Sequence, residues 1–515
     1  MKDLVNGFKS LFDIDSVTGE ILFTEEIKKH VRFLGRAFIG NNILLRMADI
    51  IPEIKTAKSI LIATYKDIHF SNTYLPMIRR SLNNLNNKFI YFNKIQEPSI
   101  TAIKELTDII CREAVDVLIA LGGGTVIDVA KCTASLALQE GEIEDYLIDK
   151  QPFNSEKRIQ MIAVPTIVSS GSEGNDCAVY IGNGDIKTSV RGLKVPFVLI
   201  DPLFLSSVSV RQATITGLDG FCQSIETFVN PNSNTFNDLL SLEAIRLFDK
   251  NLPSYLEGNI NENILWELSI AGYLHAISNF NVTYEKGGLG LAHSLVHLCN
   301  KYKIMHGNMV AILLPSTLRF LVQESTSAVQ KLQRLSEIFH IPTTTNEQGE
   351  LINKVIDYIE NFIKFFLRRA NLPIVLQESE MNLCSYMDII ETEKSKIING
   401  PLNLKINDEQ LLMILRGKQD FSGIAMIREK ILLDILKMAT KKSSFTNDLK
   451  EIRLIEGLLA DILNNYHFIK PYNVRMGWGK RDDKDLYEWV DKHIQKKYKY
   501  AVKKIRDKER IFGIC

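Results

Sequence analysis

Short runs of apolar and β-branched residues alternate with helix-length amphipathic stretches between about residue 30 and residue 200. The runs are almost continuously apolar and span residues 59–65, 88–93, 115–124, 159–166 and 196–202. Strands that are apolar along their whole length are typical of a parallel sheet covered on both faces, and the intervening stretches supply the covering helices. The first part of the chain is therefore predicted to be an α/β fold with a parallel sheet.

Beyond residue 203 the pattern becomes helical. Apolar residues recur at three- and four-residue spacing in segments such as "NDLLSLEAIRLFDKNL" and "INKVIDYIENFIKFFLRRA". A chain of 515 residues is too long for one ordinary core, so two or three domains are expected. We predict an α/β domain over residues 1–203, an all-α domain over residues 204–418 and an additional helical, basic extension over residues 419–515.

The composition excludes several classes of protein. The 62 basic and 61 acidic side chains nearly balance, which gives no electrostatic reason to expect nucleic acid as a partner. No apolar run reaches the roughly 18 to 20 residues that cross a bilayer, and the N-terminal sequence lacks the apolar core of a secretory signal. We therefore expect no membrane association and a cytoplasmic location. The seven cysteines have no CxxC spacing and predict neither a disulfide framework nor a cysteine zinc site.

The C-terminal segment 480–515 is basic and has tyrosines and Trp489 interleaved with its charges. The general rule that charge-laced helices face solvent favours an amphipathic helix that packs on the body or on a neighbouring subunit. Contact with an anionic substrate or surface is the alternative. A homo-oligomer is the expected assembly.

A glycine-rich turn, "GGGTVIDVAK" at residues 122–131, follows an apolar strand and opens a helix. Glycines let the backbone approach a ligand closely, and the free N–H groups at a helix start favour phosphate. Such a triplet is also common as a plain tight turn, and it lacks the GxGxxG spacing of the Rossmann fingerprint. Phosphate binding and a structural turn both remain open on this motif alone.

A second motif, "TGLDGFCQSIETFV" at residues 216–229, places Asp219 and Gln223 four residues apart on one helix face. If two histidines from elsewhere reach Asp219, the pair is one edge of a metal site in which a ligand has been lost. If none does, the pair is a surface feature.

These motifs resemble those of the iron-containing alcohol dehydrogenase superfamily, which includes glycerol dehydrogenase, glycerol-1-phosphate dehydrogenase and dehydroquinate synthase. "GGGTVIDVAK" resembles GGGS-x-x-D-x-AK, and "TGLDGFCQSIE" resembles TGxDAxxHAxE. Further resemblances, in the family's order, are "VPTIVSSGSE", "LIDPLFL", "GLAHSLVHLCNKYKIMHGNMVAILLP" and "NGPLNL". The resemblance covers about residues 30–418. It implies a dehydroquinate synthase-like fold, with an α/β nucleotide-binding domain followed by an all-α domain that holds metal and substrate.

The resemblance also implies a nicotinamide cofactor, NAD or NADP. Its contacts would be Gly123, Gly124, Thr125, Asp128, Thr166 and Lys187. Ile167 replaces a second threonine of the family. Many NAD-preferring members have an acid after the second strand, and Tyr65 in that region leaves the choice between NAD and NADP open.

The resemblance implies three metal ligands, Asp219, His293 and His306, for iron or zinc. Gln223 stands where iron-dependent members have a fourth ligand, a histidine. An amide oxygen is a poor donor for these metals beside two imidazoles, yet three protein ligands and an open position suit catalytic zinc. His297 lies one turn after His293. Its family counterpart lines the active site, so we predict a catalytic role, with a proton relay and a supporting hydrogen bond both possible.

The function implied is that of a metal-dependent NAD(P)-linked oxidoreductase that interconverts a small alcohol with an aldehyde or ketone by hydride transfer. A non-catalytic or metal-free cofactor-binding member is the alternative, which Gln223, Ile167 and Asn175 favour as departures from the family. A sugar-phosphate cyclase is a third possibility. Asp219, where that subgroup has glutamate, argues against it.

Overall fold

The computed structural model describes residues 11–65, 68–82, 88–168, 171–182, 187–284, 288–297, 301–342, 348–376, 379, 383–399 and 404–417. Apart from residues 408–412, the α/β and helical parts described below belong to one compact unit, which comprises Met1–Asn407 and Met413–Gln419. The predicted extension over residues 419–515 lies outside the described residues, and the domain boundaries at 203 and 418 stay predictions.

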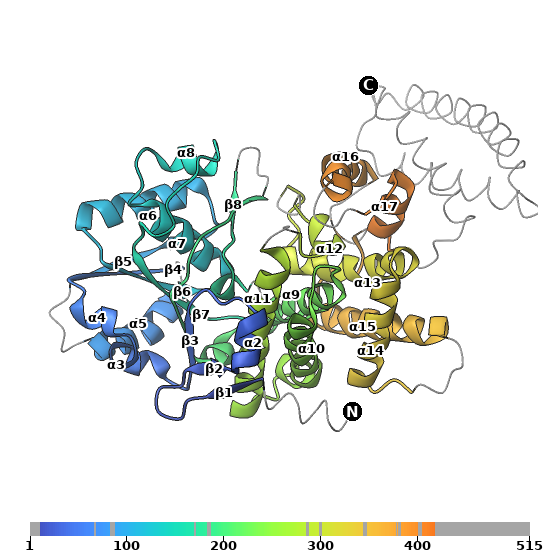
Figure 1. The fold of residues 1–515 in the computed structure, drawn as a ribbon, viewed down its shortest axis with the longest axis horizontal. Helices are drawn as coiled ribbons and strands as arrows, with labels where there is room; N and C mark the ends of the chain where they lie inside the picture. The colour runs from blue at the N-terminus through green and yellow to red at the C-terminus, as the bar shows by residue number, and fades with distance from the viewer. Residues whose placement is uncertain are drawn as a thin grey trace, which may run out of the picture. The chain divides into compact units, whose positions relative to one another are not determined.

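A six-stranded parallel sheet forms the core of the first half, as predicted (Figure 1). Its order is β3 (Arg36–Ile39), β10 (Phe197–Ile200), β7 (Gln160–Pro165), β6 (Val117–Gly122), β4 (Ser59–Tyr65) and β5 (Lys88–Ile95). Five of these strands coincide with the apolar runs of the sequence. The sixth, β3, was not predicted, because its four residues at a sheet edge make too short an apolar run to stand out.

Helices cover both faces of the sheet, as its uniformly apolar strands require. Alternate residues of β6, such as Val117, Ile119 and Leu121, enter an apolar core with one set of helices. That set comprises the 3₁₀ helix η1 (Ile43–Arg46), α3 (Met47–Ile50), α4 (Pro52–Thr56) and α5 (Ile68–Leu82). The opposite face carries α6 (Ile100–Glu113) and α7 (Gly124–Leu136), with α8 (Ile143–Leu147) against α6 (Figure 1).

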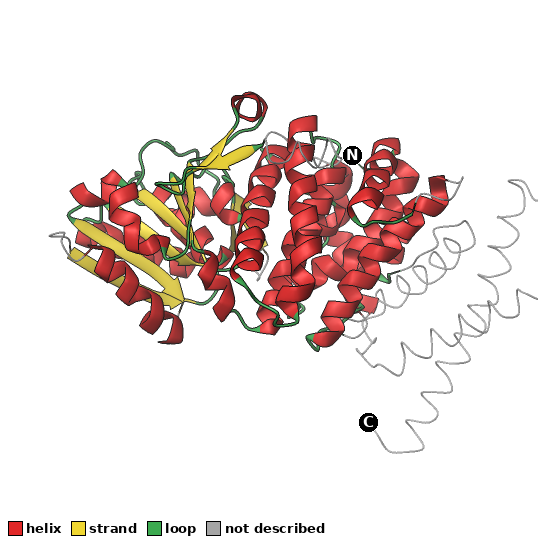
Figure 2. Ribbon diagram, turned by 90° about the horizontal axis from the view of Figure 1, so that it is seen from below, coloured by secondary structure: helices red, strands yellow, loops and turns green. Residues whose placement is uncertain are grey.

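The second half is helical, which also agrees with the predicted fold class (Figure 2). Its helices are α9 (Val210–Val229), α10 (Thr235–Leu256), α11 (Glu262–Thr283), α12 (Leu291–Ser294), α13 (His306–Glu324), α14 (Thr326–Ile338), α15 (Gln348–Arg369), α16 (Leu383–Asn399) and α17 (Asp408–Leu415). Helix α9 is buried from Ala213 to Val229 and packs against α10, α11, α13, α14 and α15. Its polar residues are therefore held inside the protein.

Side-chain caps fix where the long helices begin. Ser209, Asn234 and Asn261 each accept a hydrogen bond from the backbone N–H three residues later, at the starts of α9, α10 and α11. Helix α7 differs, because its N-cap is Gly123, which has no side chain. The first N–H groups of α7 have no intrahelical partner and are open to a ligand.

Short elements complete the described part. The antiparallel pairs are β1 (Phe12–Ile14) with β2 (Ile21–Phe23), and β8 (Ala178–Ile181) with β9 (Lys187–Val190). The remaining helices are α2 (Glu25–His30), η2 (Ser172–Gly174) and η4 (Pro202–Ser207). Among the described residues, no helix has the length and apolar character that crossing a membrane requires.

Candidate active site

A cavity of about 1070 Å³ lies between the carboxyl ends of β4 and β6 and the helices α9, α11, α12 and α13. The chain turns to opposite sides of the sheet after these two strands, and ligands of open α/β sheets bind at such a point. Eight predicted site residues line the cavity: Gly124, Thr125, Asp128, Lys187, Asp219, His293, His297 and His306. Gly123 and Thr166 are not among its lining residues.

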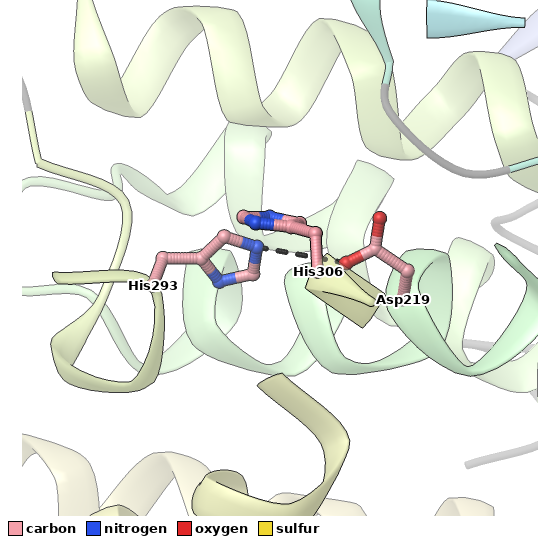
Figure 3. A group of neighbouring side chains, drawn as sticks. All are labelled: Asp219, His293 and His306. Carbon is pink, nitrogen blue, oxygen red and sulfur yellow. Dashed lines mark ion pairs between the residues drawn. The ribbon is translucent and has the colours of Figure 1, made fainter. Parts of the chain in front are cut away.

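Three predicted metal ligands come together on the helical side of the cavity (Figure 3). Asp219 lies in α9, His293 in α12, and His306 is the first residue of α13. One ligand atom from each lies within 4.8 Å of the others. His293 Nε2 is 3.7 Å from Asp219 Oδ1, too far for a hydrogen bond. His293 and His306 follow Asp219 by 74 and 87 positions in the sequence, and the three residues converge on one point.

The donors at this point fit a divalent cation. Asp219 Oδ1, His293 Nε2 and His306 Nδ1 are buried and have no hydrogen-bond partner in the described chain. Buried polar atoms without partners are costly, and their presence on three residues that converge is explained if these residues share a ligand. One carboxylate and two imidazoles are a donor set that zinc and iron accept, with one coordination position left open.

Glu226 orients His293 and was not predicted. Its carboxylate is hydrogen-bonded to His293 Nδ1 and accepts the backbone N–H of Ala292 at 2.8 Å. When Nδ1–H donates to Glu226, Nε2 of His293, which lies on the side of Asp219, is the nitrogen that can bind a metal ion. The signal was available in the sequence, because Glu226 is seven residues after Asp219 and therefore lies on the same face of α9.

The two carboxylates favour a positive charge at His293. Burial lowers the pKa of His293, but Glu226 and Asp219 outweigh burial and raise this pKa to about 9. The pKa of His306 moves the other way, because burial and then the charges of Lys187, His293 and His297 lower it well below its usual value. His306 is therefore a neutral imidazole, the form that binds metal.

Two glycines allow the helices to approach the cluster. A Cβ at Gly290 would lie 2.0 Å from Glu226 Oε1, and a Cβ at Gly307 would lie 2.5 Å from the carbonyl oxygen of Ile215. Both distances are far below van der Waals contact. Gly290 is thus needed for Glu226 to reach α12, and Gly307 for α13 to begin beside α9.

Gln223 lies on the cavity wall, one helical turn after Asp219, and only 4% of it is exposed. Asn279 of α11 donates from Nδ2 to Gln223 Oε1 at 3.5 Å. Gln223 is not a member of the three-residue cluster.

His297 lines the same cavity and is held by its Nδ1. That atom is 3.1 Å from the carbonyl oxygen of Ser294 and 3.1 Å from Glu393 Oε2. Glu393 is fully buried in α16, a helix that the sequence did not connect to the site. An Nδ1–H directed to these oxygens leaves Nε2 of His297 as a proton acceptor.

The glycine turn has fewer free backbone N–H groups than its motif suggested. The N–H of Gly123 donates to the Tyr65 hydroxyl at 2.9 Å, so the nearest backbone donor of the turn is already in use. A Cβ at Gly123 would lie 2.5 Å from Ile167 Cδ1 and 2.7 Å from the Tyr65 oxygen. Burial, the largest influence, raises the pKa of Tyr65, which therefore stays a neutral hydroxyl. Gly124 and Thr125 remain on the cavity side.

Asp128 and Lys131 of the glycine motif hold a loop in place. Asp128 accepts hydrogen bonds from the Ser172 hydroxyl and from the Val179 N–H at 3.1 Å. The fully buried Lys131 ammonium donates to the carbonyl oxygen of Ser172 at 2.8 Å and to Asn175 Oδ1 at 3.2 Å. These contacts tie α7 to the segment 172–179, so both residues have a structural role whatever Asp128 does toward a ligand.

Lys187 begins β9 and faces the cavity, with no ion pair among the described residues. Its charge is one of the influences that lower the pKa of His306. Lys187 therefore adds a positive charge to the wall of the cavity.

Comparison with known families identifies both halves of the chain. Residues 35–202 match the family described as iron-containing alcohol dehydrogenase, and residues 213–380 match the C-terminal part of the Fe-containing alcohol dehydrogenase family. Together the two matches cover more than half of the chain.

Individual relatives are distant. Long-chain-alcohol dehydrogenase 1 of Geobacillus thermodenitrificans is 27% identical over 255 residues, which are 49% of this chain and 62% of that protein. Alcohol dehydrogenase 4 of Saccharomyces cerevisiae is 25% identical over 381 residues, which are 70% of this chain and 94% of the yeast protein. The crystal structure of a 1,3-propanediol oxidoreductase superimposes with a TM-score of 0.65 at 20% identity, covering 75% of this chain and 98% of that one, which shows a shared fold.

Proposed function

Because the chain belongs to the iron-containing alcohol dehydrogenase family, we propose that it is a metal-dependent, NAD(P)-linked oxidoreductase that interconverts an alcohol with an aldehyde or ketone. Membership confirms the resemblance drawn from the motifs. The observation that carries the proposal is the convergence of Asp219, His293 and His306, with their unpartnered buried atoms, in the cavity that the glycine turn also lines.

The three-residue cluster would hold a zinc or iron ion. Such an ion supplies Lewis acidity, which lowers the pKa of an alcohol or polarises a carbonyl. The chain's own task is to keep the donors in place. Glu226 fixes the ring of His293, and Gly307 lets α13 bring His306 to α9. These supports reduce the reorganisation that ligand binding would otherwise require.

His297 is proposed as the residue that moves the proton. Its Nδ1 is directed to the Ser294 carbonyl and Glu393, so its Nε2 can accept a proton from the substrate hydroxyl, directly or through water. Protonation would then be stabilised by the buried carboxylate of Glu393 at 3.1 Å. In the reverse direction the same nitrogen returns the proton to the carbonyl oxygen.

The cofactor would lie along the β4–β6 end of the cavity, with its phosphates at the start of α7. Gly124 and Thr125 line the cavity there and offer N–H groups that the helix does not use. Lys187 and Asp128, which also line the cavity, are proposed contacts of the cofactor. A small alcohol or aldehyde would occupy the space between the cofactor and the three-residue cluster.

A direct test is to load the purified chain with Zn²⁺ or Fe²⁺ and follow the absorbance of NADH and NADPH with a panel of aldehydes. We expect metal-dependent oxidation of at least one cofactor, and its removal by a chelator. If neither cofactor binds and neither is turned over, the oxidoreductase proposal fails.

One observation favours the alternative of a binding protein without catalysis. The Tyr65 hydroxyl accepts the hydrogen bond of the Gly123 N–H, and the Ile167 side chain packs against the same turn. The end of the cavity proposed for phosphate is therefore partly filled. Calorimetric titration with NADH separates the two proposals, since metal binding without nicotinamide binding would favour the alternative.

A further inference from the structure

Gln223 and Asn279 form a pair of amides on the cavity wall beside the three-residue cluster. Gln223 comes from α9 and Asn279 from α11, and both line the cavity. Their mutual contact, from Asn279 Nδ2 to Gln223 Oε1, is 3.5 Å, at the long limit of a hydrogen bond. The two amides therefore satisfy each other only weakly.

The pair has unused hydrogen-bonding capacity. With Oε1 turned to Asn279, the NH₂ group of Gln223 has no hydrogen-bond partner in the described part of the chain, and only 4% of the residue is exposed. The NH₂ group is not among the fully buried unpartnered atoms, so it is accessible from the cavity that Gln223 lines. The cavity side is where a partner for this group can come from.

A hydroxyl is the ligand group that fits such a pair. It both donates and accepts, so it can receive the N–H of Gln223 and donate to the side-chain oxygen of Asn279. It also satisfies the pair if the Gln223 amide is turned around. An alkyl group at the same place would leave both amides unpaired.

The position of the pair relates it to the reacting oxygen. Gln223 follows Asp219 by four residues, about 6 Å along α9. A substrate whose oxygens lie on neighbouring carbons can place one oxygen at the three-residue cluster and the other at the amide pair. A simple alcohol of the same size can make the first contact only.

We propose that Gln223 and Asn279 bind a second oxygen of the substrate, which makes a vicinal diol, or the corresponding hydroxy-aldehyde or hydroxy-ketone, the preferred substrate class. The inference rests on the proposed function. In the oxidation, the carbinol carbon gives a hydride to the oxidised nicotinamide and its hydroxyl gives a proton to a base, while the second hydroxyl is unchanged. Gln223 is thus a positioning residue that selects the substrate.

Ethylene glycol and 1-propanol are a matched pair for the test, because a hydroxyl in the first replaces a methyl group in the second. The metal-loaded protein is compared with Gln223→Leu, and with Gln333→Leu as the control, because Gln333 is an exposed glutamine of α14 that does not line the cavity. kcat and KM are measured for both alcohols, together with calorimetric binding of each alcohol, bound metal and NADH affinity.

We expect the unmodified protein to favour ethylene glycol by about tenfold or more, since a site built to bind a hydroxyl discriminates strongly against an analogue without one. Gln223→Leu should lose most of this preference through a higher KM for ethylene glycol, with 1-propanol and bound metal unchanged. Gln333→Leu should keep the preference.

Three results would overturn the inference. The first is an unchanged preference for ethylene glycol in Gln223→Leu. The second is loss of bound metal in this variant, which would make Gln223 a metal ligand. The third is loss of NADH affinity, which would assign the amide pair to the nicotinamide amide of the cofactor. If neither alcohol is turned over, the proposed function is in question. Calorimetry then still tests whether the amide pair binds a hydroxyl, because equal binding of the two alcohols by the unmodified protein would refute this role.

Discussion

The buried carboxylate of Glu226 holds the ring of His293 at Nδ1 and turns its Nε2 toward Asp219. Glu226 and Asp219 are seven residues apart on α9 and therefore share one face of that helix. One helix thus supplies a candidate ligand and the group that orients a second one. Because α9 is buried along most of its length, neither carboxylate can move away without disturbing the helical core.

Glu226→Gln should weaken metal binding while leaving the fold intact. The amide keeps the size of the side chain but removes the charge that favours Nδ1–H on His293, which leaves Nε2 as the nitrogen that would bind metal. The affinity for Zn²⁺, measured by competition with a chromophoric chelator, should fall by about 10- to 100-fold.

Glu243→Gln is the matched control. Glu243 is buried in the neighbouring helix α10 and pairs with Arg246, away from the cavity. Its variant should bind Zn²⁺ as the unmodified protein does. Equal affinities for Glu226→Gln and Glu243→Gln would mean that Glu226 does not orient a ligand.

Substitutions at Gln223 and His293 rank the contributions to the metal site. His293→Ala should release the metal and eliminate turnover, whereas Gln223→Ala should keep the metal because Gln223 is outside the three-residue cluster. Gln223→His should tighten metal binding by adding an imidazole at the right helical spacing, and slow turnover by filling the open position.

Metal content after dialysis is the measurement, and His30→Ala, an exposed histidine in α2, is the control. If metal is found only in Gln223→His and not in the unmodified protein, the three residues of the cluster are insufficient to bind it. The proposed catalytic function would then give way to the binding-protein alternative.

Gly124→Val tests the cofactor site. The glycine begins α7 and lines the cavity, so two methyl groups there would cover the N–H groups proposed to bind phosphate. NADH binding, followed by calorimetry, should be abolished in a folded protein. Gly349→Val is the control, because a Cβ at Gly349 meets no atom within 4 Å. Unchanged NADH affinity in Gly124→Val would remove the phosphate assignment.

The sequence predicted the fold class because the apolar pattern of the strands reports directly on burial. Five of the six sheet strands follow from it, and only the edge strand β3 was missed. The three-residue cluster was predicted through family motifs alone, since its members lie far apart in the chain and no local pattern brings them together.

The supporting residues could not be predicted in the same way. Glu393 contacts His297 from α16, nearly a hundred residues away, and this contact exists only through the packing of the helices. Tyr65 illustrates another limit, because the sequence shows a tyrosine at the end of a strand but not that its hydroxyl reaches the Gly123 N–H.

Glu173, in the 3₁₀ helix η2, makes stability depend on pH. Burial, the largest influence, raises its pKa from 4.5 to about 7. The folded protein therefore keeps Glu173 protonated between these values, while the unfolded chain ionises it. Raising the pH through this range stabilises the unfolded state and lowers the free energy of unfolding, by at most about 3 kcal/mol from this group.

Glu173→Gln should remove this dependence, because glutamine resembles the protonated acid and does not ionise. Urea unfolding of the two proteins should give similar stabilities near about pH 5 and a growing advantage for Glu173→Gln toward about pH 8, as the ionisation of a buried acid predicts. The exposed Glu257 serves as the control, and Glu257→Gln should follow the unmodified protein at every pH. If the curves for Glu173→Gln and the unmodified protein stay parallel, Glu173 is already ionised in the folded protein, and its contact with the charge of Lys131 outweighs its burial.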